Sequence, residues 1–167
     1  LRRRLDRRMT LQGIESLPEY AERIERDTGE SAALYQDFLI RVTEFFRDPA
    51  SFDVLRRQVF PALREGPDPR QPIRIWVPGC ATGEEVYSIA IELLEWIGNR
   101  VMPSEAQIFG TDVSEAALDK ARAGIYHANG LRDVSSERRQ RFFEKHDDHF
   151  RVVKEIRDLC IFARQDV

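Results

Sequence analysis

The chain has 167 residues, of which 33% are charged and 42% hydrophobic, a composition typical of a globular protein. The net charge of −3 gives no reason to expect a nucleic-acid partner, and no apolar run approaches the roughly 18 residues needed for membrane insertion. The two cysteines, Cys80 and Cys160, lack metal-ligand spacing, so we expect no metal site and a reduced, cytoplasmic protein.

The first part of the chain predicts helices alone. Leu1, Leu5 and Met9 share one helical face. A second helix is expected from Ser16 to about Arg26, opened by a capping-box pattern. The apolar face of a third helix is formed by Leu34, Tyr35, Phe38, Leu39 and Val42.

A fourth helix is expected after Asp48-Pro49, and Pro61 should end or kink it. Its inward face is predicted to carry Phe52, Leu55, Val59 and Phe60. Pro, Gly and charged residues then make 64–71 the clearest linker. The chain is therefore divided into a helical domain (1–50), a linker helix and loop (51–71) and an α/β domain (72–167).

Residues 72–88 are the most informative stretch. The apolar run 73–77 predicts a buried strand, a loop with Gly79 and Gly83 follows, and an amphipathic helix begins at once. This is the first strand-loop-helix of a nucleotide-binding α/β sheet. The loop lacks the G-x-G-x-x-G of dinucleotide folds, and Glu84 and Glu85 would repel a phosphate at the helix start. They suit a hydroxyl-bearing, positively charged ligand without phosphate, such as S-adenosyl-L-methionine.

A second acidic landmark agrees with this interpretation. Residues 107–112 predict the next strand, and Asp112 lies at its end. In such folds an acidic residue at this place, about 20 or more residues after the glycine loop, accepts the ribose hydroxyls. Alternatively, Asp112 or Ser114 caps the helix expected at 115–123, and the two roles can coexist.

Strands and helices alternate from Pro72 onward, which indicates a parallel sheet. The helix after the glycine loop carries an apolar stripe of Val86, Ile89, Ala90, Leu93 and Ile97. Another helix is expected at 135–145. Residues 150–153 and 159–162 are interpreted as short strands joined by a charged turn, forming a hairpin appended to the sheet. His127, His146 and His149 show no ligand-like grouping in the sequence.

Residues 78–90, Pro-Gly-Cys-Ala-Thr-Gly-Glu-Glu-Val-Tyr-Ser-Ile-Ala, resemble the cofactor motif of the chemotaxis receptor methyltransferases, the CheR family. Three further segments resemble the family in the same order, namely 42–48, Thr111-Asp112 with 121–126, and 162–167. A lone glycine loop would be a weak signal, whereas four segments in order are a strong one. The resemblance covers essentially the whole chain.

The resemblance implies an α/β fold with a small all-helical N-terminal domain. It implies that the first half of a Rossmann-like methyltransferase sheet follows, with an appended small β-hairpin subdomain. The implied activity is S-adenosyl-L-methionine-dependent O-methylation of glutamate side chains on chemoreceptors, with S-adenosyl-L-homocysteine as product. Because the family has further strands after Val167, we expect a piece of a longer protein, incomplete as an enzyme by itself.

By resemblance, Glu85 contacts the amino group of the cofactor, and Thr43 and Arg47 belong to a segment that reaches over it. We expect Thr43 and Arg47 to share one side of a helix, with Arg47 as the catalytic candidate that orients a carboxylate. The resemblance also implies that Asp166 and Val167 border the adenine ring. The expected cofactor-binding residues are thus Thr43, Arg47, Gly79, Gly83, Glu85, Asp112, Asp166 and Val167. Arg41 stands where the family commonly has Asn.

A basic cluster of Arg2, Arg3, Arg4, Arg7 and Arg8, with Arg23, lies on the helical domain. The resemblance implies that this face docks on the acidic helical bundle of a chemoreceptor, while the alternative is a solvated surface. Two other functions stay open at this point. One is a non-catalytic cofactor- or receptor-binding module of a larger signalling protein, and the other is a small-molecule methyltransferase. The sequence leaves the oligomeric state undetermined.

Overall fold

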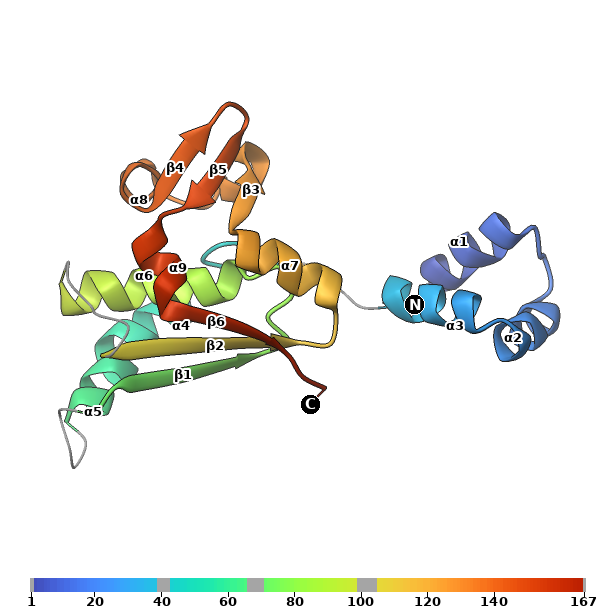
Figure 1. Ribbon diagram of the computed structural model, residues 1–167, viewed down its shortest axis with the longest axis horizontal. Helices are drawn as coiled ribbons and strands as arrows, with labels where there is room; N and C mark the ends of the chain where they lie inside the picture. Colours follow the sequence, from blue (N-terminus) through green and yellow to red (C-terminus); the bar gives the residue numbers. More distant parts are fainter. Residues whose placement is uncertain (1, 39–42, 66–70, 99–104, 167) are drawn as a thin grey trace. The chain divides into compact units, whose positions relative to one another are not determined.

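Apolar residues at helical spacing fold the first unit of the chain into helices α1 (Arg2–Gln12), α2 (Leu17–Arg26) and α3 (Thr28–Phe38) (Figure 1). The computed structural model describes residues 2–38, 43–65, 71–98 and 105–166. Met9, Tyr20 and Leu34 form the core of this unit. The second helix agrees with its predicted bounds. The third exposes Tyr35, contrary to the predicted apolar face, while Leu39 and Val42 lie outside the described residues.

A buried carboxylate joins the three helices of the first unit. Glu30 accepts hydrogen bonds from Arg8 Nε at 3.0 Å, Gln12 Nε2 at 2.6 Å and the Tyr20 hydroxyl at 2.6 Å. The Arg8 guanidinium, followed by the Tyr20 hydroxyl, holds the pKa of Glu30 below its usual range against the opposing effect of burial. The ion pair between Glu30 and Arg8 therefore stabilises the unit at pH values above the ordinary pKa of Glu30. This contribution is lost as the pH falls through the lower pKa that Glu30 has in the folded protein.

The second unit comprises residues 43–167, so residues 43–50 group with the sheet although we assigned them to the helical domain. It begins with α4 (Pro49–Val54), a π-helical turn η1 (Leu55–Val59) and α5 (Phe60–Arg64). The π-helical turn adds a residue to the helical repeat and changes which side chains face inward. Phe52 and Phe60 are buried as predicted, whereas Val59 is exposed, contrary to prediction.

Three parallel strands form the main sheet of this unit (Figure 1). Strand β1 (Ile73–Pro78) pairs with β2 (Ala106–Asp112), which pairs on its other edge with β6 (Cys160–Arg164). Helices α6 (Glu84–Ile97) and α7 (Glu115–Ala123) follow β1 and β2 and cover one face. The predicted strand-loop-helix order and the parallel sheet are confirmed.

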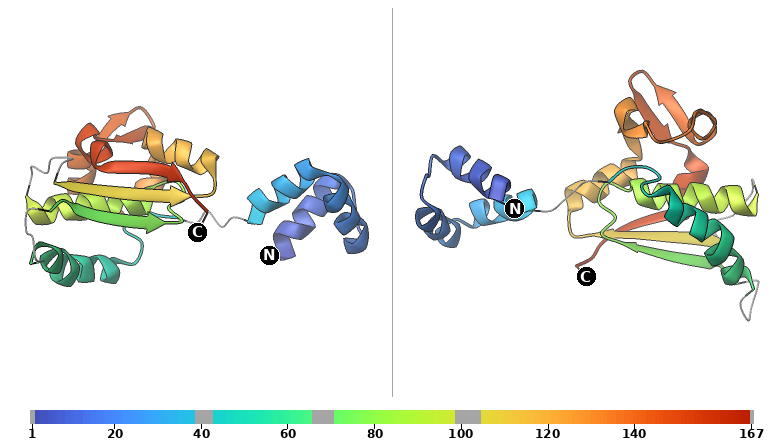
Figure 2. Two further views of the ribbon diagram at one scale, coloured as in Figure 1. Left: turned by 60° about the horizontal axis from the view of Figure 1, so that its bottom comes forward. Right: turned by 180° about the vertical axis from the view of Figure 1, so that it is seen from behind.

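A small antiparallel sheet with the strand order β3-β5-β4 is appended to the α/β core (Figure 2). Its strands are β3 (Ile125–His127), β4 (Phe143–His146) and β5 (His149–Val152). A 3-10 helix (Ala128–Leu131) and α8 (Ser136–Phe142) lie between β3 and β4. The predicted helix at 135–145 therefore ends early, and its last residues form β4.

The predicted hairpin of 150–153 with 159–162 is wrong in its pairing. The hairpin is formed by β4 and β5 across the turn at Asp147-Asp148. The residues between the two predicted strands form α9 (Lys154–Leu159), and β6 returns to the parallel sheet beside β2. Ile156 and Leu159 are buried on α9. The stretch that we interpreted as a charged turn is therefore an amphipathic helix.

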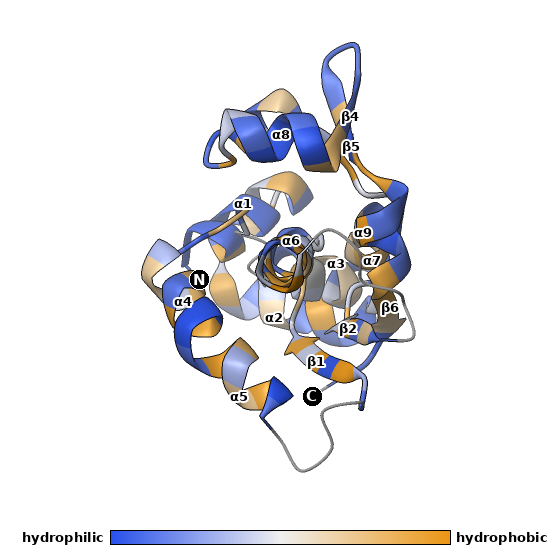
Figure 3. Ribbon diagram, turned by 90° about the vertical axis from the view of Figure 1, so that its left-hand side faces the viewer, coloured by the Kyte–Doolittle hydropathy of each residue, from blue (hydrophilic) through white to orange (hydrophobic). Residues whose placement is uncertain are grey.

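Helix α6 lies between the parallel sheet and the small sheet, as seen along its axis in Figure 3. The predicted apolar stripe is buried except at Ile97, but the helix is also buried at Tyr87, Ile91 and Leu94. It is therefore a central helix, enclosed nearly all round. Trp76 and Ile161 are exposed on β1 and β6. Within the described ranges, none of the helices has the length and apolar character that crossing a bilayer requires.

Candidate functional site

The three parallel strands end at one edge of the sheet and bring distant residues together there. Pro78 at the end of β1 is the register partner of Thr111, and Asp112 at the end of β2 is the partner of Arg164 in β6. The glycine loop, Asp112 and the residues after β6 are consequently neighbours. This edge is where open α/β sheets bind their ligands.

The glycine loop turns sharply between β1 and α6 by using left-handed backbone conformations. Gly79, Ala81 and Gly83 have φ values of 65°, 46° and 93°. The amide of Cys80 donates to the Thr111 carbonyl at 2.9 Å, which fixes the loop to β2. The Cys80 side chain is buried, and burial raises the pKa of its thiol to about 12, consistent with a small residue that fills the turn.

Gly83 is the position at which the loop comes closest to the rest of the fold. A Cβ built on Gly83 would lie 2.9 Å from the Ala121 Cβ of α7 and 3.2 Å from the Tyr126 hydroxyl. The same atom on Gly79 would meet nothing within 4 Å. Gly83 is therefore required by both backbone conformation and packing, whereas Gly79 is required by conformation alone.

Asp112 connects the glycine loop to the start of α7. One of its carboxylate oxygens accepts from the Ala81 amide at 2.9 Å, and the other accepts from the Ser114 amide at 2.8 Å. Ser114 is the N-cap of α7, and its hydroxyl accepts from the Ala117 amide. Of the two residues considered as the cap of this helix, Ser114 is therefore the one that caps it. Asp112 itself holds the loop in place, and its carboxylate retains lone pairs for further donors.

The two glutamates that open α6 differ in environment. Glu84 turns back to the loop, where its carboxylate accepts from the Thr82 hydroxyl at 2.6 and 2.9 Å. Burial raises the pKa of the Glu84 carboxyl, and the hydrogen bond from Thr82 opposes part of that rise. Glu85 is exposed at the second position of the helix. Of the two, Glu85 has the carboxylate that is open to an incoming ligand.

Replacing Glu84 with glutamine is expected to stabilise the protein at neutral pH. Because the pKa of Glu84 is raised on folding, stability is lost as the pH rises from the ordinary value of 4.5 through the folded value. Glutamine keeps an oxygen that accepts from Thr82 without the buried charge. Thermal unfolding should give a higher Tm for Glu84→Gln near pH 7 and equal values near pH 4.

The exposed Glu137 of α8 provides the matched control, since Glu137→Gln should not produce this pH-dependent gain. A Glu84→Gln variant that is less stable than the wild type at every pH would contradict the prediction. That result would mean that the ionised carboxylate is needed to hold the loop.

Residues 43–48 form a turn and not the predicted helical segment, so Thr43 and Arg47 do not share a helix face. Phe46 and Asp48 adopt positive φ values of 53° and 60°, which are incompatible with a right-handed helix. Both Phe45 and Phe46 are buried in the core. These two phenylalanines are adjacent in the sequence and both are buried, so the backbone turns here and does not continue as a helix.

This turn is attached to the first turn of α6. The Phe46 amide donates to the Ser88 hydroxyl at 2.9 Å, and that hydroxyl donates to the Glu84 carbonyl at 2.7 Å. Arg47, exposed, and Thr43, half-buried, flank the anchored phenylalanines. The structure thus fixes the backbone of the catalytic candidate to the helix that opens at the glycine loop.

Tyr126 contacts the glycine loop through its hydroxyl and the turn at 43–48 through its ring. Its hydroxyl donates to the Thr82 carbonyl at 2.7 Å, and its ring meets Phe45 edge to face at a centroid distance of 4.9 Å. Burial raises the pKa of the Tyr126 hydroxyl well above its ordinary value, so it stays a neutral donor. Tyr126 therefore connects the small sheet, the turn and the glycine loop.

Residues 41–167 match the profile of the CheR methyltransferase, SAM binding domain, and residues 1–39 match that of the CheR methyltransferase, all-alpha domain. The chain belongs to the CheR methyltransferase family. Its second unit, with the glycine loop and Asp112, lies wholly within the match to the S-adenosyl-L-methionine-binding domain. The resemblance inferred from the four sequence segments is confirmed.

Individual relatives agree with this assignment. Chemotaxis protein methyltransferase 2 of Pseudomonas aeruginosa is 34% identical over 169 residues, which cover 96% of this chain and 57% of that protein. The chemotaxis protein methyltransferase of Salmonella typhimurium is 30% identical over 166 residues, covering 96% of this chain and 54% of that protein. A 104.1 kDa protein from the hypE 3′ region of Rhodobacter capsulatus is 33% identical over 167 residues, covering 100% of this chain and 18% of that protein. This CheR-family chain thus spans little more than half of the two methyltransferases.

The residues after β6 include the last two members of the predicted CheR cofactor site, Asp166 and Val167. Asp166 follows β6 at the site edge and is exposed, and the Gln165 amide before it donates to the Asp112 carbonyl at 3.1 Å. Val167 and Arg41 lie outside the described residues. The described residues therefore support the position of Asp166 at this edge, and the remaining assignments stay predictions.

The predicted basic surface of the CheR helical domain is smaller in the structure. Arg2, Arg3 and Arg7 are exposed on α1. Arg4 and Arg8 are partly buried instead, where Arg4 donates to the Asp37 carbonyl and Arg8 pairs with Glu30. These two arginines stabilise the unit internally, so Arg2, Arg3 and Arg7 are the exposed members of the predicted set on α1.

Proposed function

We propose that the full-length protein is an S-adenosyl-L-methionine-dependent protein-glutamate O-methyltransferase that modifies chemoreceptors. The observation that supports this most directly is the loop closed by Asp112, in which the carboxylate holds the Ala81 and Ser114 amides at the strand edge. The match to both CheR domains supports the receptor as substrate class. On this proposal the chain contributes the helical domain and the first half of the catalytic domain.

The residues at the edge fit this cofactor. Its bound methyl group would supply an electrophilic carbon attached to a positively charged sulfur. Asp112 would accept the ribose hydroxyls, and Glu85 would pair with the amino group. The space beside Gly79 is open, since a methyl group there would meet nothing within 4 Å. A ligand can therefore approach the backbone at this position. Asp166 and Val167 would border the adenine, with Asp166 accepting from its amino group.

The acceptor glutamate is already ionised at neutral pH, so this chain need not supply a general base. What the protein must supply is alignment and exclusion of water around the reacting atoms. Arg47 would orient a carboxylate, and Thr43 would contact the cofactor from the same turn. The two hydrogen bonds through Ser88 support this role, since they hold the turn on α6.

The helical domain would dock on an acidic helical bundle of the receptor through Arg2, Arg3 and Arg7. Contacts between exposed charges weaken with salt, so docking should be salt-dependent. A cytoplasmic location is part of the same proposal and is consistent with two free cysteines. A receptor fragment tested against small carboxylic acids as methyl acceptors would separate this proposal from a small-molecule methyltransferase.

Calorimetric titration with S-adenosyl-L-homocysteine tests the proposed cofactor site. Asp112→Ala and Glu85→Ala are each expected to weaken binding by about 1–3 kcal/mol, because each removes an acceptor for a polar group of the ligand. Asp119→Ala is the matched control, since Asp119 lies on the exposed face of α7, paired with Arg122. It should leave the affinity unchanged.

The Tm of each variant should be measured in the same series, because Asp112 also holds the loop. A folded Glu85→Ala variant with wild-type affinity would contradict the amino-group assignment. A folded wild-type protein that binds no S-adenosyl-L-homocysteine would contradict the cofactor proposal and favour the non-catalytic module.

A further inference from the structure

The outward face of the small sheet carries a row of histidines, although the sequence predicted no grouping of these residues. His149 in β5 is the register partner of His127 in β3 and of His146 in β4. Directly paired residues of an antiparallel sheet project to the same face. Tyr126 and Val152 project to the other face and are buried there. All three histidines of the chain therefore lie on one exposed surface.

An acidic side chain completes a compact cluster with two of them. Asp148 lies in the turn between β4 and β5, and its carboxylate oxygens are 2.6 Å from His149 Nδ1 and 4.0 Å from His127 Nδ1. The rings of His127 and His149 are 4.2 Å apart between centroids. One nitrogen or oxygen from each of the three residues lies within 4.8 Å of the other two.

We propose that His127, Asp148 and His149 bind a divalent transition-metal ion, with Zn²⁺ as the representative ion. Two imidazole nitrogens and one carboxylate oxygen form a donor set that suits Zn²⁺, whereas Mg²⁺ and Ca²⁺ prefer oxygen ligands alone. Three protein ligands leave a fourth tetrahedral position open to water or to a group from another molecule.

The backbone around the cluster is already held in the required arrangement. The Ala128 amide donates to the Asp148 carbonyl at 3.3 Å, which extends the pairing of β3 with β5 into the turn. Tetrahedral ligands at about 2.0–2.1 Å from Zn²⁺ lie about 3.4 Å from one another. His127 therefore has to move closer to Asp148, from which it is 4.0 Å away, whereas the 2.6 Å contact between Asp148 and His149 has to lengthen. Exposed side chains can make this change by rotation alone.

The surface next to the cluster leaves space for such a rotation. A hollow of about 480 Å³ is lined by Ile125, His146, Asp147, His149 and Arg151. His149 belongs both to the hollow and to the cluster. The proposed site faces away from the buried side of the small sheet, where the Tyr126 hydroxyl contacts the glycine loop. It is thus a second site, separate from the cofactor edge.

Titration of ZnCl₂ into tag-free, chelator-treated full-length protein tests the proposal by calorimetry. We expect one saturable site, and we expect His127→Gln and His149→Gln each to weaken it at least tenfold. Even the loss of an outer hydrogen-bond partner commonly weakens a metal site by about 10–100-fold, and these variants remove a ligand. Zn²⁺ should also raise the Tm of the wild-type protein more than that of either variant.

His146→Gln is the matched control, because His146 is the chain's third histidine and its Nε2 lies 3.8 Å from Glu144 Oε2 on the same strand. It should keep wild-type affinity for Zn²⁺. The altered side chains are at least 39% exposed, so the Tm of each variant without metal should be close to that of the wild type. Wild-type affinity in His149→Gln would overturn the proposal, as would an equal loss in His146→Gln or equal binding of Mg²⁺.

Discussion

Gly83→Ala is expected to lower the free energy of unfolding by about 2–5 kcal/mol and to weaken binding of S-adenosyl-L-homocysteine at least tenfold. The left-handed conformation of Gly83, at φ 93°, costs an alanine about 1–2 kcal/mol. The added methyl group would also lie 2.9 Å from the Ala121 Cβ, and overpacking of this kind costs about 1–3 kcal/mol. The loop can relieve the contact only by moving away from α7.

Such a movement would affect the cofactor edge directly. The Thr82 carbonyl, next to Gly83, accepts the hydrogen bond from Tyr126, and the Ala81 amide donates to Asp112. A displaced loop would strain both contacts, so the loss of affinity should be larger than the loss of stability alone explains. Chemical denaturation and calorimetric titration of the same variant measure the two quantities.

Gly79→Ala is the control that separates conformation from crowding. Gly79 also has a positive φ, 65°, but its added methyl group would meet nothing within 4 Å. The expected loss is about 1 kcal/mol, from the backbone conformation alone. Equal losses in the two variants would show that the contact with α7 is relieved without cost and would contradict the packing argument.

The parts of the fold that were predicted correctly depend on local sequence. The strand before Gly79 and the helix after Gly83 follow from apolar periodicity and from glycines at the required turn. Asp112 was predicted at the end of the strand 107–112, and the carboxyl ends of parallel strands meet at one edge of the sheet. The contact of Asp112 with the Ala81 amide confirms this proximity, which short-range patterns and one topological rule were sufficient to predict.

The errors arose where partners distant in sequence decide the structure. Residues 43–48 have a helical pattern, but burial of both Phe45 and Phe46 against the core requires a turn. The strand at 160–164 pairs with β2, 48 or more residues earlier, and not with its neighbour β5. Local propensity contains no information on either choice, because both depend on tertiary packing.

Two polar arrangements had weaker signals in the sequence. Glu92 lies in a helix that is apolar on nearly every side, so its burial and its need for a cationic partner could have been inferred. The identity of that partner, Arg138 of α8, could not, because the two residues lie on separate elements. The grouping of His127 with His149 likewise depends on the β3–β5 register, which the predicted hairpin did not include.

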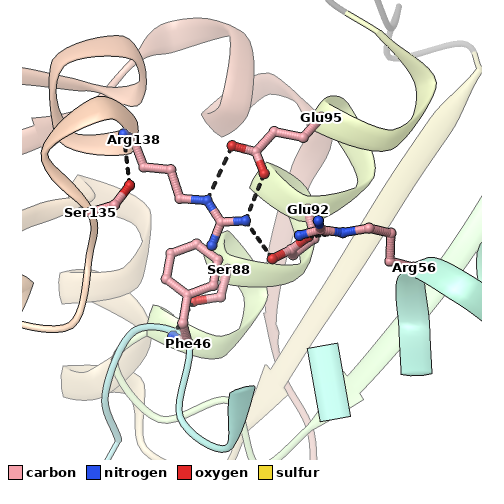
Figure 4. A network of polar contacts seen from close by, with 7 residues as sticks. All are labelled: Phe46, Arg56, Ser88, Glu92, Glu95, Ser135 and Arg138. Atoms are coloured by element: carbon pink, nitrogen blue, oxygen red, sulfur yellow. Dashed lines mark hydrogen bonds and ion pairs between the residues drawn. The ribbon is translucent and has the colours of Figure 1, made fainter. Parts of the chain in front are cut away.

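The buried charge cluster around Glu92 should respond strongly to the loss of Arg138 (Figure 4). Arg138 Nη2 lies 2.5 Å from Glu92 Oε1 and 2.6 Å from Glu95 Oε2, and the Glu92 side chain is 2% exposed. Arg56 binds the other oxygen of Glu92 at 2.6 Å. Arg138→Met would leave one buried carboxylate oxygen without the partner it has in the structure. We therefore expect a loss of about 3 kcal/mol in the free energy of unfolding.

The effect should extend to the proposed cofactor site. The Arg138 guanidinium lies over the Phe46 ring at 4.1 Å from its centroid, and Phe46 anchors the turn that carries Arg47. Loss of this contact should loosen the turn and weaken binding of S-adenosyl-L-homocysteine. Arg122→Met is the matched control. Arg122 pairs with Glu115 and Asp119 on the surface, where the loss of an ion pair should cost much less stability than the loss of Arg138.

A double-mutant cycle measures the interaction energy between Arg138 and Glu92. Arg138→Met leaves Glu92 buried with less compensation, whereas Glu92→Met combined with Arg138→Met removes both charges and keeps apolar volume. The double variant should therefore be less destabilised than the sum of the single variants, by about 1–3 kcal/mol. Arg56 is nearly half exposed and can be solvated when Glu92 is absent. Additive losses would mean that Arg138 stabilises the protein through its contacts with Glu95 and the Phe46 ring and not through Glu92.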